Sequence, residues 1–490
     1  MKKLTLFILI IIVGLQKSSA QNYSALNKAI SAFVSDQSLS HAGISICVID
    51  AGTGLVVASH NPELSLTPAS SMKVVTTGAA LGMMGPDYTF KTELQYDGQI
   101  DPEEGILYGN LYIKGFGDPT LGTDHIPGIL QTQEVMDTFG KEVEKQNICS
   151  INGRIIGDGT FFSADEAIGS NWQWDDIGNS YGAGAYGLNI NENQYSLLLQ
   201  QNTVIGSAPK IIGSVPFIPE ISFVNQLITG PANSPEKTNI YTAPYNDEVI
   251  VRGTIPAGTN IIKIEGAMPD PPYAAAYYFN EMLKNRFHVQ IKRKPLSITD
   301  LKLAPKGSRK TFFTFSSPKL TKIVEEANQE SNNMFVEALL RAIAKFQNEE
   351  GTPTKGCEVV MNYWKSKGID LNGFFMEDGS GLSSRSAVSS HQLASILQQL
   401  NSDPIIGPAF YESLPKAGES GTLKSMFKKS AALGKLRAKS GSMTRVRSYT
   451  GYIDKKDGTR LCFSMIVNNF TCNNYEMKAK MEQLMIRFCE

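Results

Sequence analysis

The first feature that could carry chemistry is the pair Ser70 and Lys73, spaced S-x-x-K in the segment TPASSMKVVTT. If this segment is helical, the two side chains rise from one face, one turn apart. A hydroxyl is a weak nucleophile, but a lysine that burial keeps partly neutral can take its proton while the oxygen attacks a carbonyl. Amide groups at a helix N-terminus would stabilise the negative charge that develops. The pair alone is a weak signal, because this spacing is common in a chain of 490 residues.

Two later motifs supply other polar groups that such a reaction needs. Ser331 and Asn333 form S-x-N between two expected helices, where a hydroxyl can relay a proton and an amide can hold a substrate carbonyl. Lys439, Ser440 and Gly441 form K-S-G on an expected strand. There the lysine supplies positive charge, the serine a hydrogen bond, and the glycine lets a substrate backbone lie close to the strand. Three motifs in this order, each on the expected kind of element, indicate one active site.

The elements that must position these motifs are helices and strands near both ends of the chain. Thr67 and Pro68 are the expected cap and first turn of the helix that carries Lys73. Apolar periodicity predicts helices at 23–34, 71–84, 318–329, 333–346, 356–368, 389–400 and 473–488, and strands at 42–50, 55–60, 436–442, 448–455 and 459–469. Because the strands come from both ends, we expect one sheet whose domain encloses the middle of the chain as an insertion.

The middle of the chain differs in texture. Residues 91–192 are rich in glycine with short alternating segments, and residues 208–301 are β-like with frequent proline and glycine. We therefore expect two inserted domains of mostly β structure over these ranges. The rest, residues 21–90, 193–207 and 302–490, would form the domain that carries the motifs. The expected fold class is α/β (α+β), with an antiparallel sheet flanked by helices.

The first 20 residues have the features of a cleaved secretory signal. Lys2 and Lys3 precede an apolar run that ends at Leu15, and small residues, including Ala20, precede the expected cut. The run is shorter than the roughly 20 residues that a membrane span needs, and no other segment is apolar enough. We expect an exported protein with no membrane span after cleavage.

Charge and composition exclude several classes of protein. The chain has 46 basic and 47 acidic residues, and removal of the signal leaves 43 basic groups and a net charge of about −4. A basic nucleic-acid-binding face is therefore not expected. The six cysteines are too few for a disulfide scaffold, and their pairing stays open. The five histidines never fall at ligand spacing, so we predict no metal and no cofactor, and their scarcity argues against a Ser-His-Asp hydrolase.

Together, the S-x-x-K, S-x-N and K-S-G motifs resemble the set that marks the penicillin-recognising serine enzymes. The chain resembles one branch, the class C low-molecular-mass penicillin-binding proteins, which are D-alanyl-D-alanine carboxypeptidase/endopeptidases. That branch has a large insertion between the first two motifs, and here Ser331 follows Ser70 by 261 residues. Further similar segments are GDPTL (117–121), GDGTFF (157–162), EDGSGLSSRSAVS (377–389), LPKAGESGTLKSMF (414–427) and SYTGYI (448–453). The resemblance spans nearly the whole mature chain.

The resemblance implies roles in the chemical steps for four residues. Ser70 would be the acylated nucleophile, and Lys73 the base that activates it. Ser331 would pass the proton to the leaving amine. The backbone N–H groups of Ser70 and Ser442 would form the oxyanion hole. The loop at 378–381 would form part of the active-site wall.

The resemblance also implies which residues bind substrate. Asn333 would bind the acyl-side amide, and Lys439 and Ser440 would recognise the terminal carboxylate of D-alanine. This sequence departs from the family at Asn332, where the branch often has aspartate, and at Ser440, where threonine is commoner. Contact with substrate stays open for three arginines near the third motif: Arg437, Arg445 and Arg447.

The expected function is that of a secreted, periplasmic serine hydrolase. It would cleave terminal D-alanine from peptidoglycan stem peptides, or D-alanyl cross-links between stems, through an acyl-Ser70 intermediate. β-Lactams would mimic the substrate and inhibit. One alternative is a β-lactamase, for which the chain is too long and lacks a convincing glutamate to activate water. The other is a catalytically silent cell-wall-binding protein, against which the intact Ser70 and Lys73 argue. The balance of the two peptidase activities, the role of the insertions and the oligomeric state stay open.

Overall fold

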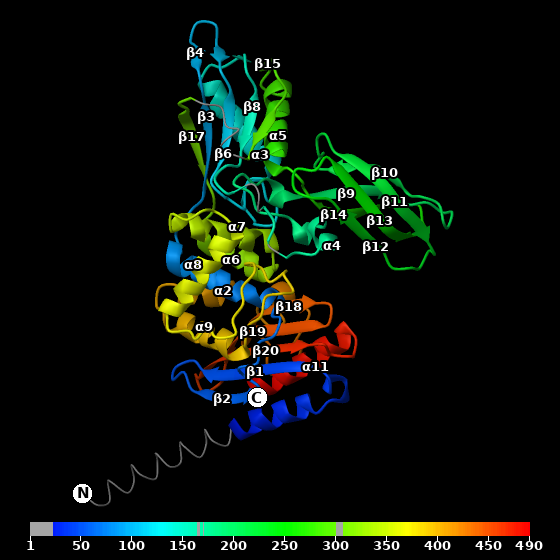
Figure 1. Ribbon diagram of the computed structural model, residues 1–490, viewed down its shortest axis with the longest axis vertical. Helices are drawn as coiled ribbons and strands as arrows, with labels where there is room; N and C mark the ends of the chain where they lie inside the picture. Colours follow the sequence, from blue (N-terminus) through cyan, green and yellow to red (C-terminus); the bar gives the residue numbers. More distant parts are fainter. Residues whose placement is uncertain (1–22, 164–166, 170, 300–306) are drawn as a thin grey trace, which may run out of the picture.

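The computed structural model describes residues 23–163, 167–169, 171–299 and 307–490. The predicted signal at 1–20 and the predicted domain boundary at 301–302 lie outside the described residues. Figure 1 shows an elongated molecule in which the first and last described segments lie at one end and the middle of the chain projects from the other. Among the described helices, none combines the length and the apolar character that crossing a bilayer requires.

Both ends of the chain contribute to one five-stranded antiparallel sheet, as the sequence pattern predicts. Its order is β18-β19-β20-β1-β2. The bounds are Gly43–Asp50 for β1, Val56–His60 for β2, Leu436–Met443 for β18, Val446–Asp454 for β19 and Arg460–Asn468 for β20. Strand β1 pairs with β20 from Gly43–Asn468 to Asp50–Leu461, so the N-terminal and C-terminal segments fold as one unit.

Apolar side chains on both faces of this sheet explain its layers. On β1, Ile46 and Val48 face one core, while Cys47 and Ile49 face the other, as the pleat of a strand requires. The first core is closed by the helix at 23–34 and by α11 (Asn474–Cys489). The second is closed by α10 (Gly407–Ser413) and by helices that Figure 1 shows between the sheet and the inserted part: α2 (Lys73–Met84), α6 (Leu320–Gln329), α7 (Asn333–Phe346), α8 (Pro353–Ser366) and α9 (Ser390–Ser402).

The first part of the insertion builds two mixed sheets around a core of its own. The larger sheet has the order β16-β8-β6-β3-β17, and the smaller β15-β7-β5-β4. Helices α3 (Thr132–Lys145) and α5 (Pro271–Asn285) pack in the same core, where the rings of Phe139 and Phe279 meet at 5.8 Å. The strand bounds are Lys91–Tyr96 (β3), Gln99–Asp101 (β4), Ile106–Tyr108 (β5), Leu111–Gly115 (β6), Ser150–Ile151 (β7), Ile155–Asp158 (β8), Gln290–Ile291 (β15), Leu296–Ile298 (β16) and Lys310–Ser316 (β17).

The second part of the insertion is a small sandwich of two three-stranded sheets. Their orders are β10-β9-β14 and β11-β13-β12, and Leu197, Leu199 and Val251 lie in the core between them. The bounds are Gln194–Gln200 (β9), Lys210–Val215 (β10), Ser222–Gly230 (β11), Lys237–Tyr241 (β12), Glu248–Pro256 (β13) and Ile261–Ala267 (β14), with the short α4 at Trp174–Ile177 nearby. The predicted β character of the insertions agrees with these sheets.

Two strands pair outside the domain in which the sequence pattern predicts them. Residues 193–207 are expected in the motif-bearing domain, yet β9 alternates buried and half-buried residues and forms the centre of the sandwich sheet. Likewise β17, expected in the motif-bearing domain, pairs with β3. Pairing partners distant in sequence decide both placements, and a texture change along the chain does not reveal them.

Two of the cysteines lie in the central five-stranded sheet. Cys47 on β1 and Cys462 on β20 are fully buried. All six cysteines lie within the described residues and are free thiols.

Candidate active site

Ser70 lies in a short 3-10 turn that leads directly into α2. This turn, η2, spans Ala69–Met72, and the backbone of Ala69 has φ = +48°. The predicted cap Thr67 is wrong: its hydroxyl donates to the carbonyl of Ser384 at 3.2 Å, and no side chain in the described part of the chain caps η2. The backbone at Ser70 therefore has the geometry of a 3-10 turn and not that of a capped α-helix, and this geometry orients the Ser70 side chain. Lys73 is the first residue of α2.

The ammonium group of Lys73 is the centre of the site. Its Nζ lies 3.0 Å from Ser70 Oγ, 2.5 Å from Oδ1 of Asn333 and 2.8 Å from the carbonyl oxygen of Ser380. Complete burial lowers the pKa of Lys73 to about 7, although nearby Asp378 and Glu337 oppose this shift. A large fraction is thus uncharged near neutral pH, which lets the amine accept the Ser70 proton. The structure confirms the predicted proximity of the Ser70 and Lys73 side chains.

The second motif lies at the N-terminus of α7. Asn332 is the N-cap, and its Oδ1 accepts from the N–H of Phe335 at 3.2 Å. Ser331 directly before it has φ = +63°. Its Oγ accepts a hydrogen bond from Lys439 Nζ at 2.8 Å, while Asn333 Nδ2 donates to the carbonyl of Tyr181 at 2.7 Å. The S-x-N motif is therefore held between the third motif and the insertion.

The third motif lies on the edge strand β18, beside Ser70. Lys439 is fully buried, and burial, assisted by the charge of Lys73, lowers its pKa well below the usual range. The hydroxyl of Ser440 donates to that of Thr422 at 2.9 Å. Ser442, two residues further along the strand, is exposed. The structure thus brings together the motif side chains of Ser70, Lys73, Ser331, Asn333 and Lys439.

The structure shows why position 441 is a glycine, and the sequence pattern does not reveal this reason. A Cβ atom there would lie 2.6 Å from the carbonyl oxygen of Pro68, 2.9 Å from the nitrogen of Ser70 and 2.3 Å from Oγ of Ser448. The expected reason is close approach of substrate backbone, but the close neighbour in the structure is the chain's own η2. A side chain at this position would push β18 away from the nucleophile.

A buried carboxylate pair behind Lys73 was not identifiable from the motifs. Glu337 on α7 accepts hydrogen bonds from the backbone N–H groups of Ser380 (2.7 Å) and Gly379 (3.3 Å). Asp378 accepts from the indole of Trp172 at 2.8 Å. Burial raises the pKa of both carboxyl groups. The signal for Glu337 in the sequence is one acidic residue in the apolar run NMFVEALL, four residues after Asn333.

The insertion contacts the second motif through Glu192. This residue is in η5 (Asn191–Asn193), where all three residues have positive φ, between 51° and 55°. Its Oε2 accepts a hydrogen bond from Asn332 Nδ2 at 2.7 Å, and its Oε1 accepts one from the hydroxyl of Thr123. Burial raises the pKa of Glu192.

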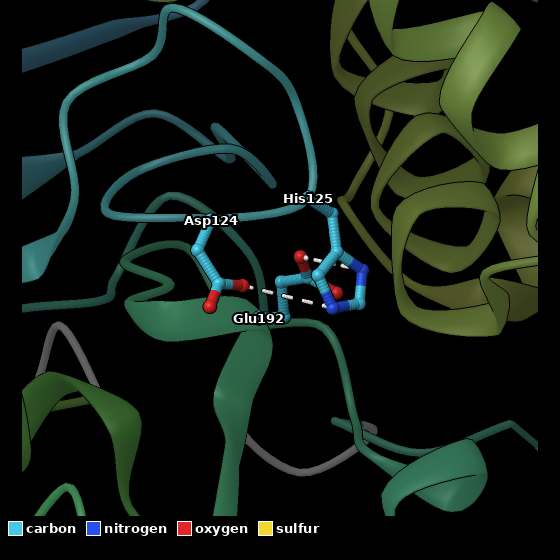
Figure 2. A group of neighbouring side chains, drawn as sticks. All are labelled: Asp124, His125 and Glu192. Carbon is cyan, nitrogen blue, oxygen red and sulfur yellow. Dashed lines mark ion pairs between the residues drawn. The ribbon is translucent and has the colours of Figure 1, made fainter.

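Glu192 also belongs to a group of side chains of metal-binding type. One ligand atom each from Asp124, His125 and Glu192 lie within 4.8 Å of one another. Figure 2 shows two ion pairs of His125 within this group: Nδ1 lies 3.2 Å from Glu192 Oε1, and Nε2 lies 3.7 Å from Asp124 Oδ1. The spacing of histidines in the sequence predicts no metal site. It does not reveal this group, because the group has one histidine, His125, and Glu192 joins Asp124 and His125 only in the folded chain. His125 also lies 3.7 Å from Glu326 Oε1, so the group connects the insertion to α6.

The three arginines near the third motif differ in their surroundings. Arg437 forms an ion pair with Glu412 and donates to the carbonyl of Leu414 at 3.1 Å. Arg445 is exposed in the turn between β18 and β19, and Arg447 lies over the ring of Tyr449 at 6.0 Å. Arg437 is thus held by the chain itself.

Comparison with known proteins agrees with this geometry. The chain is 27% identical over 472 residues to the D-alanyl-D-alanine carboxypeptidase of Actinomadura sp. (strain R39), covering 93% of this chain and 83% of the relative. It is 24% identical to a D-alanyl-D-alanine carboxypeptidase of Haemophilus influenzae, covering 87% and 85% of the two chains. The crystal structure of penicillin binding protein 4 from H. influenzae has the same fold, with a TM-score of 0.77 and 22% identity, over 94% of this chain and 97% of that one. The predicted fold class is confirmed.

A family model decides the assignment. It describes the D-Ala-D-Ala carboxypeptidase 3 (S13) family and matches residues 26–488, which is nearly all of the described chain and both parts of the insertion. The resemblance to D-alanyl-D-alanine carboxypeptidases that the motifs indicate is thereby confirmed. The chain belongs to the D-Ala-D-Ala carboxypeptidase 3 (S13) family of serine peptidases.

Proposed function

We propose that this enzyme hydrolyses D-alanyl peptide bonds of peptidoglycan through an acyl-Ser70 intermediate, both at the terminal D-alanine of stem peptides and at D-alanyl cross-links between stems. The observation that carries the proposal is the 3.0 Å contact between Lys73 Nζ and Ser70 Oγ, together with the lowered pKa of that lysine. A buried amine that is partly neutral at pH 7 beside a serine is suited to activating it as a nucleophile.

In the acylation step, neutral Lys73 takes the proton of Ser70 while Oγ attacks the carbonyl of the D-alanyl bond. The N–H groups of Ser70 and Ser442 stabilise the negative oxygen of the tetrahedral intermediate. The C–N bond then breaks, and the hydroxyl of Ser331 gives a proton to the leaving amine. Ser331 recovers its proton from the Lys73 ammonium group. The 2.8 Å contact between Lys439 Nζ and Ser331 Oγ supports this role, because a hydrogen-bond donor beside Oγ lowers the cost of negative charge on the relay.

Substrate binding uses the groups around these atoms. Asn333 binds the acyl-side amide, Lys439 and Ser440 hold the carboxylate next to the leaving amine, and Gly441 keeps β18 close enough for both. The exposed side chain of Ser442 supports an accessible strand edge. In the second step, water attacks the acyl-Ser70 ester with Lys73 as base, and the free serine returns.

β-Lactams acylate the same serine in this proposal. Support comes from the penicillin binding protein 4 of H. influenzae, whose structure is known in complex with a β-lactam and matches this chain with a TM-score of 0.74. Peptidoglycan lies outside the cytoplasmic membrane, so the proposal requires export, in keeping with the predicted signal at residues 1–20. We infer a periplasmic location on these grounds.

The experiment is digestion of two purified muropeptides, a monomeric stem ending in D-Ala-D-Ala and a D-alanyl cross-linked dimer, with chromatography of the products. The wild-type enzyme should release D-alanine from the first and monomers from the second, and Ser70→Ala should do neither. No product from either substrate, combined with rapid penicillin hydrolysis, would identify a β-lactamase. No product and no penicillin reaction would favour a cell-wall-binding protein.

A further inference from the structure

A cavity of about 820 Å³ opens next to the third motif. Its walls come from α6, from the connection between α10 and β18, and from the loop before α3. Glu330, in the wall, directly precedes Ser331 in the chain. Arg437, also in the wall, is two residues before Lys439 on β18, so both side chains are on the same face of the strand. Two wall residues are therefore one and two positions along the chain from the groups that, in the proposed function, act on the leaving amine and its carboxylate.

A second part of the cavity wall, at Gly421, also lies close in the chain to a residue that contacts the third motif. Gly421 lines the cavity and begins η7 (Gly421–Leu423). The next residue, Thr422, accepts the hydrogen bond from Ser440. Gly421 has φ = +51°, and a Cβ atom there would lie 2.5 Å from Oε1 of Gln329 on α6. The glycine thus lets η7 approach α6 and shapes the end of the cavity nearest to Ser440.

Three buried polar atoms in the wall have no hydrogen-bond partner among the residues that the structure describes. They are Oε1 of Glu326, Oε1 of Gln329 and Nε of Arg437. Buried polar atoms in folded proteins are nearly always paired, with protein, water or ligand. Oε1 of Glu326 lies 3.7 Å from Nδ1 of His125, which leaves the acceptor of Gln329 and the donor of Arg437 as wall groups that suit an occupant with both N–H and C=O groups. A peptide has these groups.

The charges around the cavity point to an occupant that is itself charged. The wall has four cations and five carboxylates. Lys322 pairs with Glu325, Lys416 with Glu419 and Arg437 with Glu412. Among the described residues, Lys424 is the wall cation without an ion-pair partner, and it is exposed. Walls that contain both cations and carboxylates suit a peptide that carries both charges. Lys424, which has no ion-pair partner among the described residues, suits an additional carboxylate of that peptide.

We propose that this cavity, which we name the leaving-stem groove, binds the stem peptide whose amine is released when a cross-link is cut. The inference rests on the proposed function, since it needs a D-alanyl bond to be cleaved at Ser70. A volume of about 820 Å³ is typical of sites for ligands much larger than one alanine. When D-alanine leaves, most of the groove holds only water. When a cross-link is cut, the second stem fills it, with a carboxylate of that stem on Lys424.

The test compares kcat/KM on the two substrates, the monomeric D-Ala-D-Ala stem and the D-alanyl cross-linked dimer. Lys424→Glu is the groove variant, and Lys365→Glu, an exposed lysine on α8 outside the groove, is the matched control. Loss of a charge-assisted contact is expected to lower kcat/KM on the dimer about tenfold or more and to leave that on the monomer within about twofold. Lys424→Trp, which adds bulk at the rim, should show the same split. The rate of acylation by penicillin reports that each variant is folded.

The outcomes separate the groove from the function on which it rests. A dimer-selective loss in both Lys424 variants, absent in Lys365→Glu, supports the groove. Equal losses on the two substrates, or no loss on either, would overturn the groove alone. A wild-type enzyme that releases D-alanine but leaves the dimer intact would overturn both the groove and the cross-link half of the proposed function.

Discussion

The side-chain amide of Asn332 donates a hydrogen bond to Oε2 of Glu192 over 2.7 Å. Glu192 belongs to the insertion, whereas Asn332 lies between Ser331 and Asn333 and caps α7. The acceptor is presented by a segment with three consecutive residues at positive φ, a conformation that persists only where the surroundings fix it. The insertion thus acts on the second motif as a support, and Glu192 is a positioning residue.

Removal of that support should slow acylation. Glu192→Ala leaves the amide of Asn332 without its charged acceptor and lets the start of α7 shift. We expect kcat/KM for penicillin acylation to fall roughly 10-fold to 100-fold, the value of a hydrogen bond to a charged group. Stopped-flow measurement of acylation with a fluorescent penicillin gives this number.

Two further variants separate positioning from general destabilisation. Glu192→Gln keeps an acceptor oxygen for Asn332 and should recover most of the rate. Glu248→Ala changes an exposed glutamate at the start of β13 and should have no effect. If Glu192→Ala lowers the melting temperature but leaves the acylation rate of the folded protein unchanged, the positioning role is wrong.

The pH dependence of acylation should follow Lys73. Because burial lowers its pKa to about 7, the amine is mostly charged below that pH and mostly neutral above it. Only the neutral form accepts the Ser70 proton, so kcat/KM for penicillin should fall with decreasing pH below about 7 and level off above it. A profile that is flat between pH 6 and pH 8 in this enzyme, in the same fluorescent assay, would argue that another group is the base.

Glu337 should set the position of that profile. Its charge favours the protonated form of Lys73 and so opposes the effect of burial. Glu337→Gln removes the charge but keeps an oxygen for the N–H of Ser380, so the pKa of Lys73 should fall and the acid limb should move to lower pH. Glu358→Gln, on the exposed side of α8, is the control. A shift to higher pH would contradict the electrostatic coupling.

Gly441 should tolerate no side chain. In Gly441→Ala the new methyl group meets the backbone of Pro68 and Ser70, so β18 or η2 must move. We expect a loss of about 1–3 kcal/mol in the free energy of unfolding, the usual cost of overpacking, and slower acylation. Gly52→Ala is the control, because a Cβ there meets only Asp50 Oδ1 at 3.5 Å. Denaturant unfolding measures the loss of stability, and the acylation rate measures the loss of activity. Equal stabilities of Gly441→Ala and Gly52→Ala would contradict the prediction, because β18 could then shift without cost.

Much of the motif-bearing fold follows from the sequence because local patterns decide it. The helix predicted at 333–346 has the bounds of α7, and the strands predicted at 436–442 and 448–455 coincide closely with β18 and β19. Buried helices and strands have strong apolar periodicity, and the motifs name side chains that must meet. The proximity of Ser70, Lys73 and Lys439 is predictable for this reason.

The remaining parts depend on contacts between distant segments. Three residues near the site belong to no recognisable motif, and only their contacts in the folded chain reveal their roles. Glu192 binds the cap residue of α7, Trp172 binds Asp378, and Glu337 binds the N–H of Ser380. The placements of β9 and β17 are decided by partners far along the chain. The sequence predicts a helix start capped by Thr67, but the turn η2 forms there. This difference is a tertiary effect, because the hydroxyl of Thr67 donates to the carbonyl of Ser384, which is distant in sequence.

The central claim is that Ser70 is the nucleophile. The measurement that tests it most directly is the intact mass of the purified protein after brief exposure to penicillin, beside the Ser70→Ala variant. The account predicts one stable penicilloyl adduct on the wild type and none on the variant. An adduct on both proteins, or on neither, would contradict it.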